Sequence, residues 1–303
     1  MNIRSDMIEE FMLRRLHAGV DHREETVQLK SEREFIHRSP VSIRIVLLLL
    51  FVVMALSQVY SQSLNDRIYH AYISAEMDEW FNTMTEMQSV WEITGSYDML
   101  YDLVVAQYGY IAFSIAAGHD RVAREYVREA EDNLEILLDQ FPEKARAHAL
   151  LGAIYGFKVG LNPIKAVVFG TRAIKENARS MELDPDDPQI WMEKGNIQFF
   201  KPDLFGPDSR EAARHYRKAV ELFESNPKDT VKNWLYLNTL RNLADAYIDY
   251  GAYYKADETY RKILRVEPGL SWIRERDYPE FLEKYGGEVS RQPAVGSRQS
   301  AAV

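Results

Sequence analysis

The chain has 303 residues, of which 46% are hydrophobic and 27% charged, a balance typical of a folded globular protein. Its 37 Lys and Arg against 46 Asp and Glu give a net charge of −9, which argues against a nucleic-acid partner because neutralising phosphates requires clustered cations. The absence of cysteine excludes disulfides, thiolate metal sites, a cysteine nucleophile and a lipidated cysteine.

The segment 41–57 predicts export. Arg44 precedes an unbroken apolar run over 45–56, and Ala55 and Ser57 place small residues at the two positions that signal peptidase reads. We therefore interpret 41–57 as a signal peptide and expect an exported protein of the periplasm or cell envelope. As a helix the apolar run spans about 18 Å against a hydrocarbon core of roughly 30 Å. A single-pass inner-membrane anchor, with a tether through residues 43–60 if the signal is uncleaved, is the alternative.

Residues 1–40 form a polar extension that is too long for the charged start of a signal peptide. One hypothesis is a misplaced start, with translation beginning at Val41 as the initiator. The alternative is a genuine cytoplasmic tail ahead of a short membrane anchor.

From Leu64 onward apolar residues recur at spacings of three and four, which predicts an all-α domain over 58–285. Its first part, 64–91, is rich in Met and aromatic residues. We expect this part to be an N-terminal cap or a helix that faces a partner.

A nearly complete helix pair stands at 240–268. Gly251 separates the two helices and Pro268 closes the second. Small and aromatic residues share one face of each helix: Leu240, Leu243, Ala244 and Tyr247 on the first, and Ala256, Tyr260 and Ile263 on the second. This pattern resembles the tetratricopeptide repeat (TPR), in which small side chains let two antiparallel helices approach closely.

Three further units precede this one, with breaks at Pro142, Pro185 and Pro227. Their marker residues are Ala123, Val127 and Ala130 in a degraded first unit; Leu151, Gly152, Tyr155 and Ala173 in the second; and Trp191, Gly195, Ala212, Tyr216 and Ala219 in the third. The resemblance implies a right-handed superhelical stack of antiparallel helix pairs, a TPR-like α-solenoid, and roughly four pairs suffice for a continuous core. Residues 272–285 predict a C-terminal cap helix, and 286–303 a disordered tail.

Two apolar segments, 157–170 and 199–208, depart from the short polar turns of the plain repeat and are interpreted as insertions with a function. From Ala106 to Tyr285 the chain also resembles a group of exported bacterial TPR proteins. The shared features are a Gly-Phe-Lys stretch, an Asn-Pro insertion, a Trp-x-Glu-Lys-Gly-Asn helix and a Pro-rich loop that ends in Phe-Gly. That group has no established biochemical role, so the resemblance bears on fold and export.

No constellation of an enzyme is present, and we predict neither a catalytic nor a metal or cofactor site. His119 and Asp120 follow Gly118 in a turn, while His148 and His215 lie singly on helices without a second ligand at helical spacing. Asp184, Asp186 and Asp187 lack the glycine and final glutamate of a calcium loop. Asp187 followed by Pro188 is typical of a helix start.

We therefore predict a non-catalytic scaffold that binds a protein or peptide through side chains on the inner helices and in the two apolar segments. The candidate contact residues are Tyr155, Asn162, Phe169, Trp191, Lys194, Gln198, Phe200, Phe205 and Tyr247. The alternative is a periplasmic accessory component of a substrate-binding-protein-dependent transporter, in which repeat-like helices surround a pore in an oligomer.

Overall fold

The computed structural model describes residues 40–202 and 206–291, all of whose regular elements are helical. The chain divides into two units, Met1–Tyr60 and Ser61–Val303, and helix α3 crosses the boundary between them. The α-helices are α3 (Pro40–Ser74), α4 (Met77–Thr94), α5 (Tyr97–Ala116), α6 (Asp120–Gln140), α7 (Ala145–Leu161), α8 (Ala166–Leu183), α9 (Pro188–Phe199), α10 (Ser209–Ser225), α11 (Trp234–Asp249), α12 (Tyr253–Val266) and α13 (Tyr278–Arg291).

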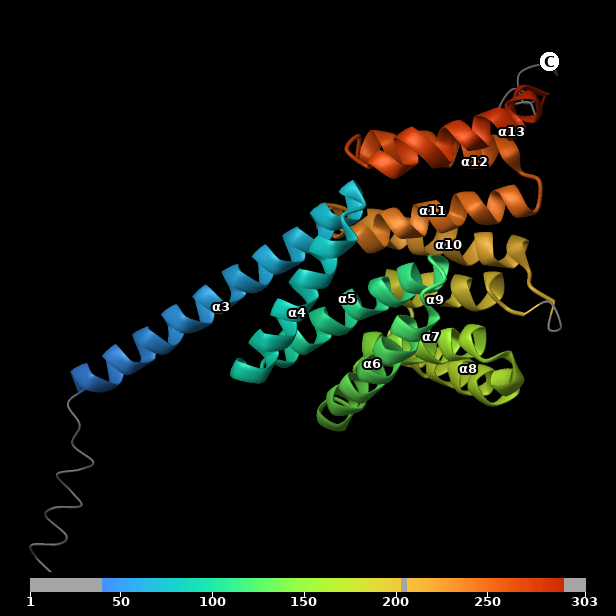
Figure 1. Ribbon diagram of the computed structural model, residues 1–303. Coiled ribbons are helices and arrows are strands. Elements are labelled where there is room, and N and C mark those ends of the chain that lie inside the picture. The colour runs from blue at the N-terminus through green and yellow to red at the C-terminus, as the bar shows by residue number, and fades with distance from the viewer. Residues whose placement is uncertain (1–39, 203–205, 292–303) are drawn as a thin grey trace, which may run out of the picture. The chain divides into compact units, whose positions relative to one another are not determined.

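In the second unit, consecutive helices pack as the pairs α5–α6, α7–α8, α9–α10 and α11–α12 (Figure 1). This confirms the predicted TPR-like solenoid for the described residues. The small residues lie where the helices meet: a Cβ on Gly195 of α9 would stand 2.5 Å from the ring of Tyr216 on α10, and one on Gly152 of α7 would stand 3.1 Å from the Ala173 carbonyl oxygen on α8. Only small side chains permit this approach.

Several helix ends follow from local sequence. The Asp187 carboxylate accepts hydrogen bonds from the backbone N–H groups of Gln189 (2.8 Å) and Ile190 (3.4 Å), with Pro188 in the first turn. This confirms the predicted helix start. Gly118 (φ +73°) and Gly251 (φ +78°) take the left-handed backbone at the turns that follow α5 and α11, a conformation that favours glycine.

The segment 64–91 is a structural part of the core. It forms the end of α3 and most of α4, and Trp80 is buried there with its indole N–H donating to the Ala106 carbonyl at 3.0 Å. The rings of Trp80 and Trp234 meet at 5.1 Å, so α4 joins α5 to the start of α11. This packing against α5 favours the predicted N-terminal cap over a partner-facing helix, since Trp80, Met84 and Met87 are buried, whereas Phe81 is 38% exposed.

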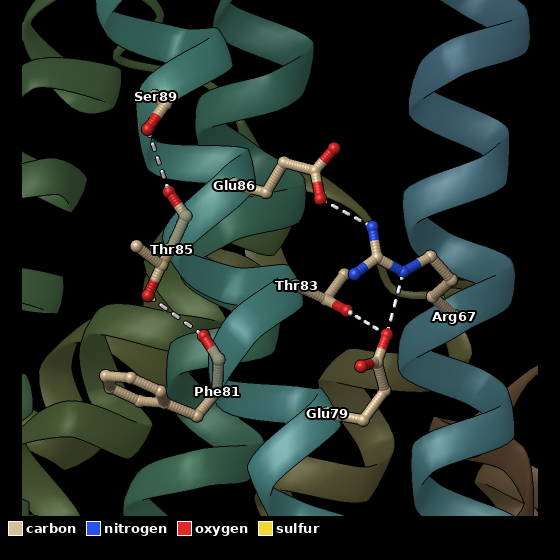
Figure 2. Close-up of polar contacts among 7 residues, drawn as sticks. All are labelled: Arg67, Glu79, Phe81, Thr83, Thr85, Glu86 and Ser89. Atoms are coloured by element: carbon tan, nitrogen blue, oxygen red, sulfur yellow. Dashed lines mark hydrogen bonds and ion pairs between the residues drawn. The ribbon is translucent and has the colours of Figure 1, made fainter.

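Ion pairs fasten α3 to α4. The Arg67 guanidinium binds the carboxylates of Glu79 at 2.8 Å and Glu86 at 2.5 Å, and the Thr83 hydroxyl donates to Glu79 (Figure 2). These side chains are partly exposed, so each pair contributes at most about 1 kcal/mol. The buried aromatic residues of the same region contribute more to the free energy of unfolding.

The end of α3 also reaches the C-terminal part of the chain. The Trp272 indole N–H donates to the Tyr72 carbonyl at 3.0 Å, and the Ser271 hydroxyl donates to the Ile73 carbonyl at 3.1 Å. The Tyr69 hydroxyl binds the Glu267 carboxylate. The end of α3 therefore contacts the segment between α12 and α13 directly.

Two predicted boundaries are wrong. The segment 157–170 is almost entirely helical, since α7 continues to Leu161 and α8 begins at Ala166, with only Asn162 and the 3₁₀ turn Pro163–Lys165 between them. Its apolar residues lengthen both helices. The C-terminal cap helix, which begins with a π-helical stretch at Ile273–Asp277, is confirmed but runs to Arg291, beyond the predicted start of the tail at 286. Residues 292–303 lie outside the described residues, as do 1–39.

The predicted signal or anchor lies at the beginning of α3, where Ile45, Leu47 and Leu48 are exposed. Whether this helix is cleaved or spans a membrane stays a prediction. Helix α5 is also long and apolar enough to cross a membrane, by length and composition alone. Half of its apolar window is buried inside the fold, as expected for a core helix.

A candidate binding cleft

A cleft of about 470 Å³ lies between α6 and the connection from α7 to α8. Its lining combines cations with apolar side chains: Arg121, Arg124, Val127 and Arg128 from α6; Lys158 and Leu161 from α7; Asn162 and Lys165 from the connection; and Phe169 from α8. No acidic residue lines it, although the whole chain is acidic.

The three arginines share one face of α6 because they stand three and four positions apart. Arg124 donates to the Leu161 carbonyl at 2.5 Å and lies 3.9 Å from the Asp120 carboxylate. Within the described part of the chain, Arg121 and Arg128 form no ion pair. Two of the three charges are therefore available to a ligand.

Lysines complete the positive lining. Lys158 pairs with Glu131, so its charge is largely neutralised. Lys165 is exposed and forms no ion pair with any residue that the structure describes. Three positive charges without a partner, Arg121, Arg128 and Lys165, thus surround one cleft, which favours a ligand of negative charge.

The ring of Phe169 lines the cleft, and the ring of Tyr155 supports it from behind the lining. Tyr155 and Phe169 stack with their centroids 6.4 Å apart, and the Lys158 ammonium lies 5.5 Å from the Tyr155 ring and 5.3 Å from the Phe169 ring. The Arg172 guanidinium also stands over the Tyr155 ring, at 5.6 Å. These contacts hold the rings and the cations in fixed positions beside the apolar floor of Val127 and Leu161.

The structure therefore brings three of the predicted contact residues, Tyr155, Asn162 and Phe169, to the cleft or its wall. Trp191 and Lys194 form a separate pair on α9, with the Lys194 ammonium 4.9 Å from the indole ring, whose N–H donates to the Pro185 carbonyl. The backbone carbonyl of Gln198 accepts a hydrogen bond from the backbone N–H of Asp208, and this bond connects the two ends of the loop that follows α9.

The remaining predicted contact residues are dispersed. Phe200 is 64% exposed and packs edge-on against Phe199, whereas Tyr247 is 7% exposed and belongs to the core, which leaves little of its ring for a partner. Phe205 lies outside the described residues. The cations of α6 were not predicted as contact residues, although their spacing along the helix was a visible signal.

His148 and His215 have partners within the fold. His148 lies 2.7 Å from Glu176 and 2.9 Å from the Pro142 carbonyl, while His215 lies 3.0 Å from Glu211. Burial, assisted by the charges of Lys194 and Arg214, lowers the pKa of His215 to about 4, so this imidazole is neutral at pH 7. No group of three potential metal ligands occurs among the described residues.

A second cleft, between α11, α12 and α13, differs in charge. It has a volume of about 270 Å³, and its lining includes Arg241, Asp245 and Asp277. Arg241 lies 3.0 Å from Asp245, so cation and anion neutralise each other inside the protein. The cleft beside α6 is the one with unpaired charge of a single sign.

The helix pairs define this chain as a TPR-like helical-repeat protein. It is similar in fold to a thermophilic TPR protein of Thermus thermophilus, with a TM-score of 0.49, 16% identity and coverage of 69% of this chain and 93% of that one. It is also similar to the HusA haemophore of Porphyromonas gingivalis, with a TM-score of 0.49, 16% identity and coverage of 63% and 94%. No family model and no curated protein matches the sequence.

Proposed function

We propose that this protein is a non-catalytic binding scaffold of the cell envelope, and that the cleft beside α6 holds an acidic, partly apolar segment of a protein partner. The observation that carries the proposal is the cleft lining, in which Arg121, Arg128 and Lys165 surround apolar Val127, Leu161 and Phe169 without any acidic side chain. A carboxylate of the partner replaces the missing counter-charge, and its apolar side chains cover the floor.

Recognition by side chains suits this architecture. Helices use their backbone N–H and C=O groups internally, so a helical repeat contacts a partner through side chains. Envelope location is part of the proposal and is supported by the apolar run over 45–56 and by the exposed apolar residues at the start of α3. A non-catalytic role is supported by the contacts of His148 with Glu176 and of His215 with Glu211, which occupy both imidazoles.

The test uses synthetic peptides of equal length: one acidic and apolar, one acidic and polar, and one basic and apolar. The full chain is expected to bind the first with the highest affinity, with weakening as salt rises. The double variant Arg121→Glu/Arg128→Glu should lose at least about tenfold in affinity, since it places two charges of the wrong sign in the cleft.

The matched control is Arg210→Glu/Arg217→Glu on α10, which changes the net charge by the same amount away from the cleft. Its affinity for the acidic, apolar peptide should equal that of the unmodified chain. Equal loss in both double variants, or no preference for the acidic and apolar peptide, would refute the proposal.

A further inference from the structure

The outer face of α8 and the turn before it carries an apolar stripe that no part of the described chain covers. Ile164 is 96% exposed, Val167 68%, Val168 54% and Ile174 59%. Their spacing of three, four and six positions places them along one side of the helix, while Ala166, Ala173 and Asn177 lie on the buried side. Four large aliphatic residues on one exposed helix face indicate a contact surface.

The charge around this stripe has one sign. Residues 144–175 contain no Asp or Glu, although the chain has 46 of them in 303 residues. Lys165, Arg172 and Lys175 flank the stripe and are exposed, and Lys165 and Lys175 form no ion pair within the described ranges. The nearest carboxylate along α8 is Glu176, which is occupied by His148.

We infer that this surface binds an anionic phospholipid membrane, with the stripe Ile164, Val167, Val168 and Ile174 in the interfacial region and the lysines at the headgroups. An amphipathic helix with cations beside its apolar face binds such a surface by both burial and charge attraction. An acidic protein groove would account for the lysines. The near-complete exposure of Ile164 at the tip of a turn fits insertion between lipid headgroups better than contact with a flat protein face.

This inference concerns a different surface and a different ligand from the proposed function, and the two sites share only Lys165. The ligand of the cleft would contact Arg121, Arg128 and Phe169. The apolar stripe lies on the exposed side of α8, whereas Ala166 and Ala173 lie on its buried side. Binding of acidic peptides can therefore fail while membrane contact persists, and the reverse.

The chain has no cysteine, so a single environment-sensitive fluorophore can be placed by substitution. The full chain with Val167→Cys, labelled at that position, is mixed with vesicles of phosphatidylglycerol and phosphatidylcholine or of phosphatidylcholine alone. We expect a blue shift of emission and a loss of quenching by aqueous acrylamide with the anionic vesicles only. The matched control is Val231→Cys, because Val231 has the same 68% exposure and lies outside the stripe.

A third protein, Val167→Cys with Lys165→Glu and Lys175→Glu, tests the charge contribution, and its label should show little shift with either vesicle. Three results would overturn the inference: a label at 167 that stays in water with anionic vesicles, equal shifts at 167 and 231, or a blue shift at 167 without lipid that grows with protein concentration. The last result would identify a second copy of the chain as the occupant of the stripe.

Discussion

Gly195 lets α9 and α10 approach closely because it has no Cβ. A Cβ at this position would lie 2.5 and 2.6 Å from two carbons of the Tyr216 ring, a distance that real contacts do not reach. Tyr216 is fully buried, and its hydroxyl donates to the Asn196 side chain at 2.7 Å, so the ring cannot move aside without breaking that bond.

We expect Gly195→Ala to lower the free energy of unfolding by about 1–3 kcal/mol, the usual cost of overpacking. The measurement is urea unfolding followed by far-UV circular dichroism. Gly156→Ala on α7 is the control, because nothing lies within 4 Å of the added Cβ. That variant should be unchanged or more stable by up to about 1 kcal/mol, since alanine favours helices. A stable Gly195→Ala protein would show that α9 and α10 can separate freely.

A buried polar network joins α9 to α5, α10 and α11. The Asn196 amide donates to the Glu193 carboxylate at 2.9 Å and to the Tyr108 hydroxyl of α5 at 3.1 Å, while Asn242 of α11 donates to the Asn196 oxygen at 3.2 Å. One oxygen of Glu193 has no hydrogen-bond partner. Because an ionised carboxylate without full solvation is costly, this group is held in its neutral form over a wide pH range.

Burial raises the pKa of Glu193 to about 7, and hydrogen bonds from Asn196 and Tyr108 offset part of that rise. The folded protein therefore retains a proton that the unfolded chain releases near pH 4.5, and this contribution to stability is lost as pH rises from about 4.5 to 7. Glu193→Gln should gain stability relative to the unmodified chain across this window, by an amount on the order of 3 kcal/mol. Urea unfolding at several pH values measures the difference, and a difference independent of pH would contradict this role.

At the level of helices, much of the fold followed from sequence. Alanine and glycine at the helix crossings, with glycine and proline at the breaks, predicted all four pairs, because close packing and chain termination depend on local residue type. The start of α9 followed equally well from Asp187 and Pro188. These features need no knowledge of distant residues.

Other elements were mistaken because their surroundings decide their role. The apolar residues of 157–170 suggested an insertion, whereas helices α7 and α8 simply extend through them. The segment 64–91 suggested either an N-terminal cap or a partner-facing helix, and the choice between them depends on contacts with Trp234 and Trp272, more than a hundred residues away. Likewise the basic cleft arises where α6 meets the α7–α8 connection, so the sequence showed the spacing of the arginines on α6 but not that Lys165 and Phe169 lie beside them.

For the whole second unit, the contact between the end of α3 and the segment that follows α12 should contribute measurably to the free energy of unfolding. Trp272 donates its indole N–H to the Tyr72 carbonyl, and the two rings meet edge-on at 5.5 Å. Trp272→Ala should lower the free energy of unfolding by about 2–4 kcal/mol, since it removes a large, partly buried ring. Trp272→Phe keeps an aromatic ring and loses only the hydrogen bond, for a loss of about 1 kcal/mol.

Both variants are measured by urea unfolding of the full chain, with circular dichroism in the far ultraviolet as the signal. Equal losses in the two variants would mean that the hydrogen bond rather than the ring carries the contact. Unchanged stability in both would remove the energetic link between α3 and the residues that follow α12.

In most repeat arrays a further repeat can be added at either end, because each repeat touches only its neighbours. Here the beginning of the folded unit hydrogen-bonds to residues 198 and 200 positions later in the chain. A duplicated helix pair inserted between these ends would move them apart. Such a duplication would therefore break the hydrogen bonds from Ser271 and Trp272 to the end of α3. A ribosome-bound chain likewise leaves α3 without that contact until Trp272 has emerged.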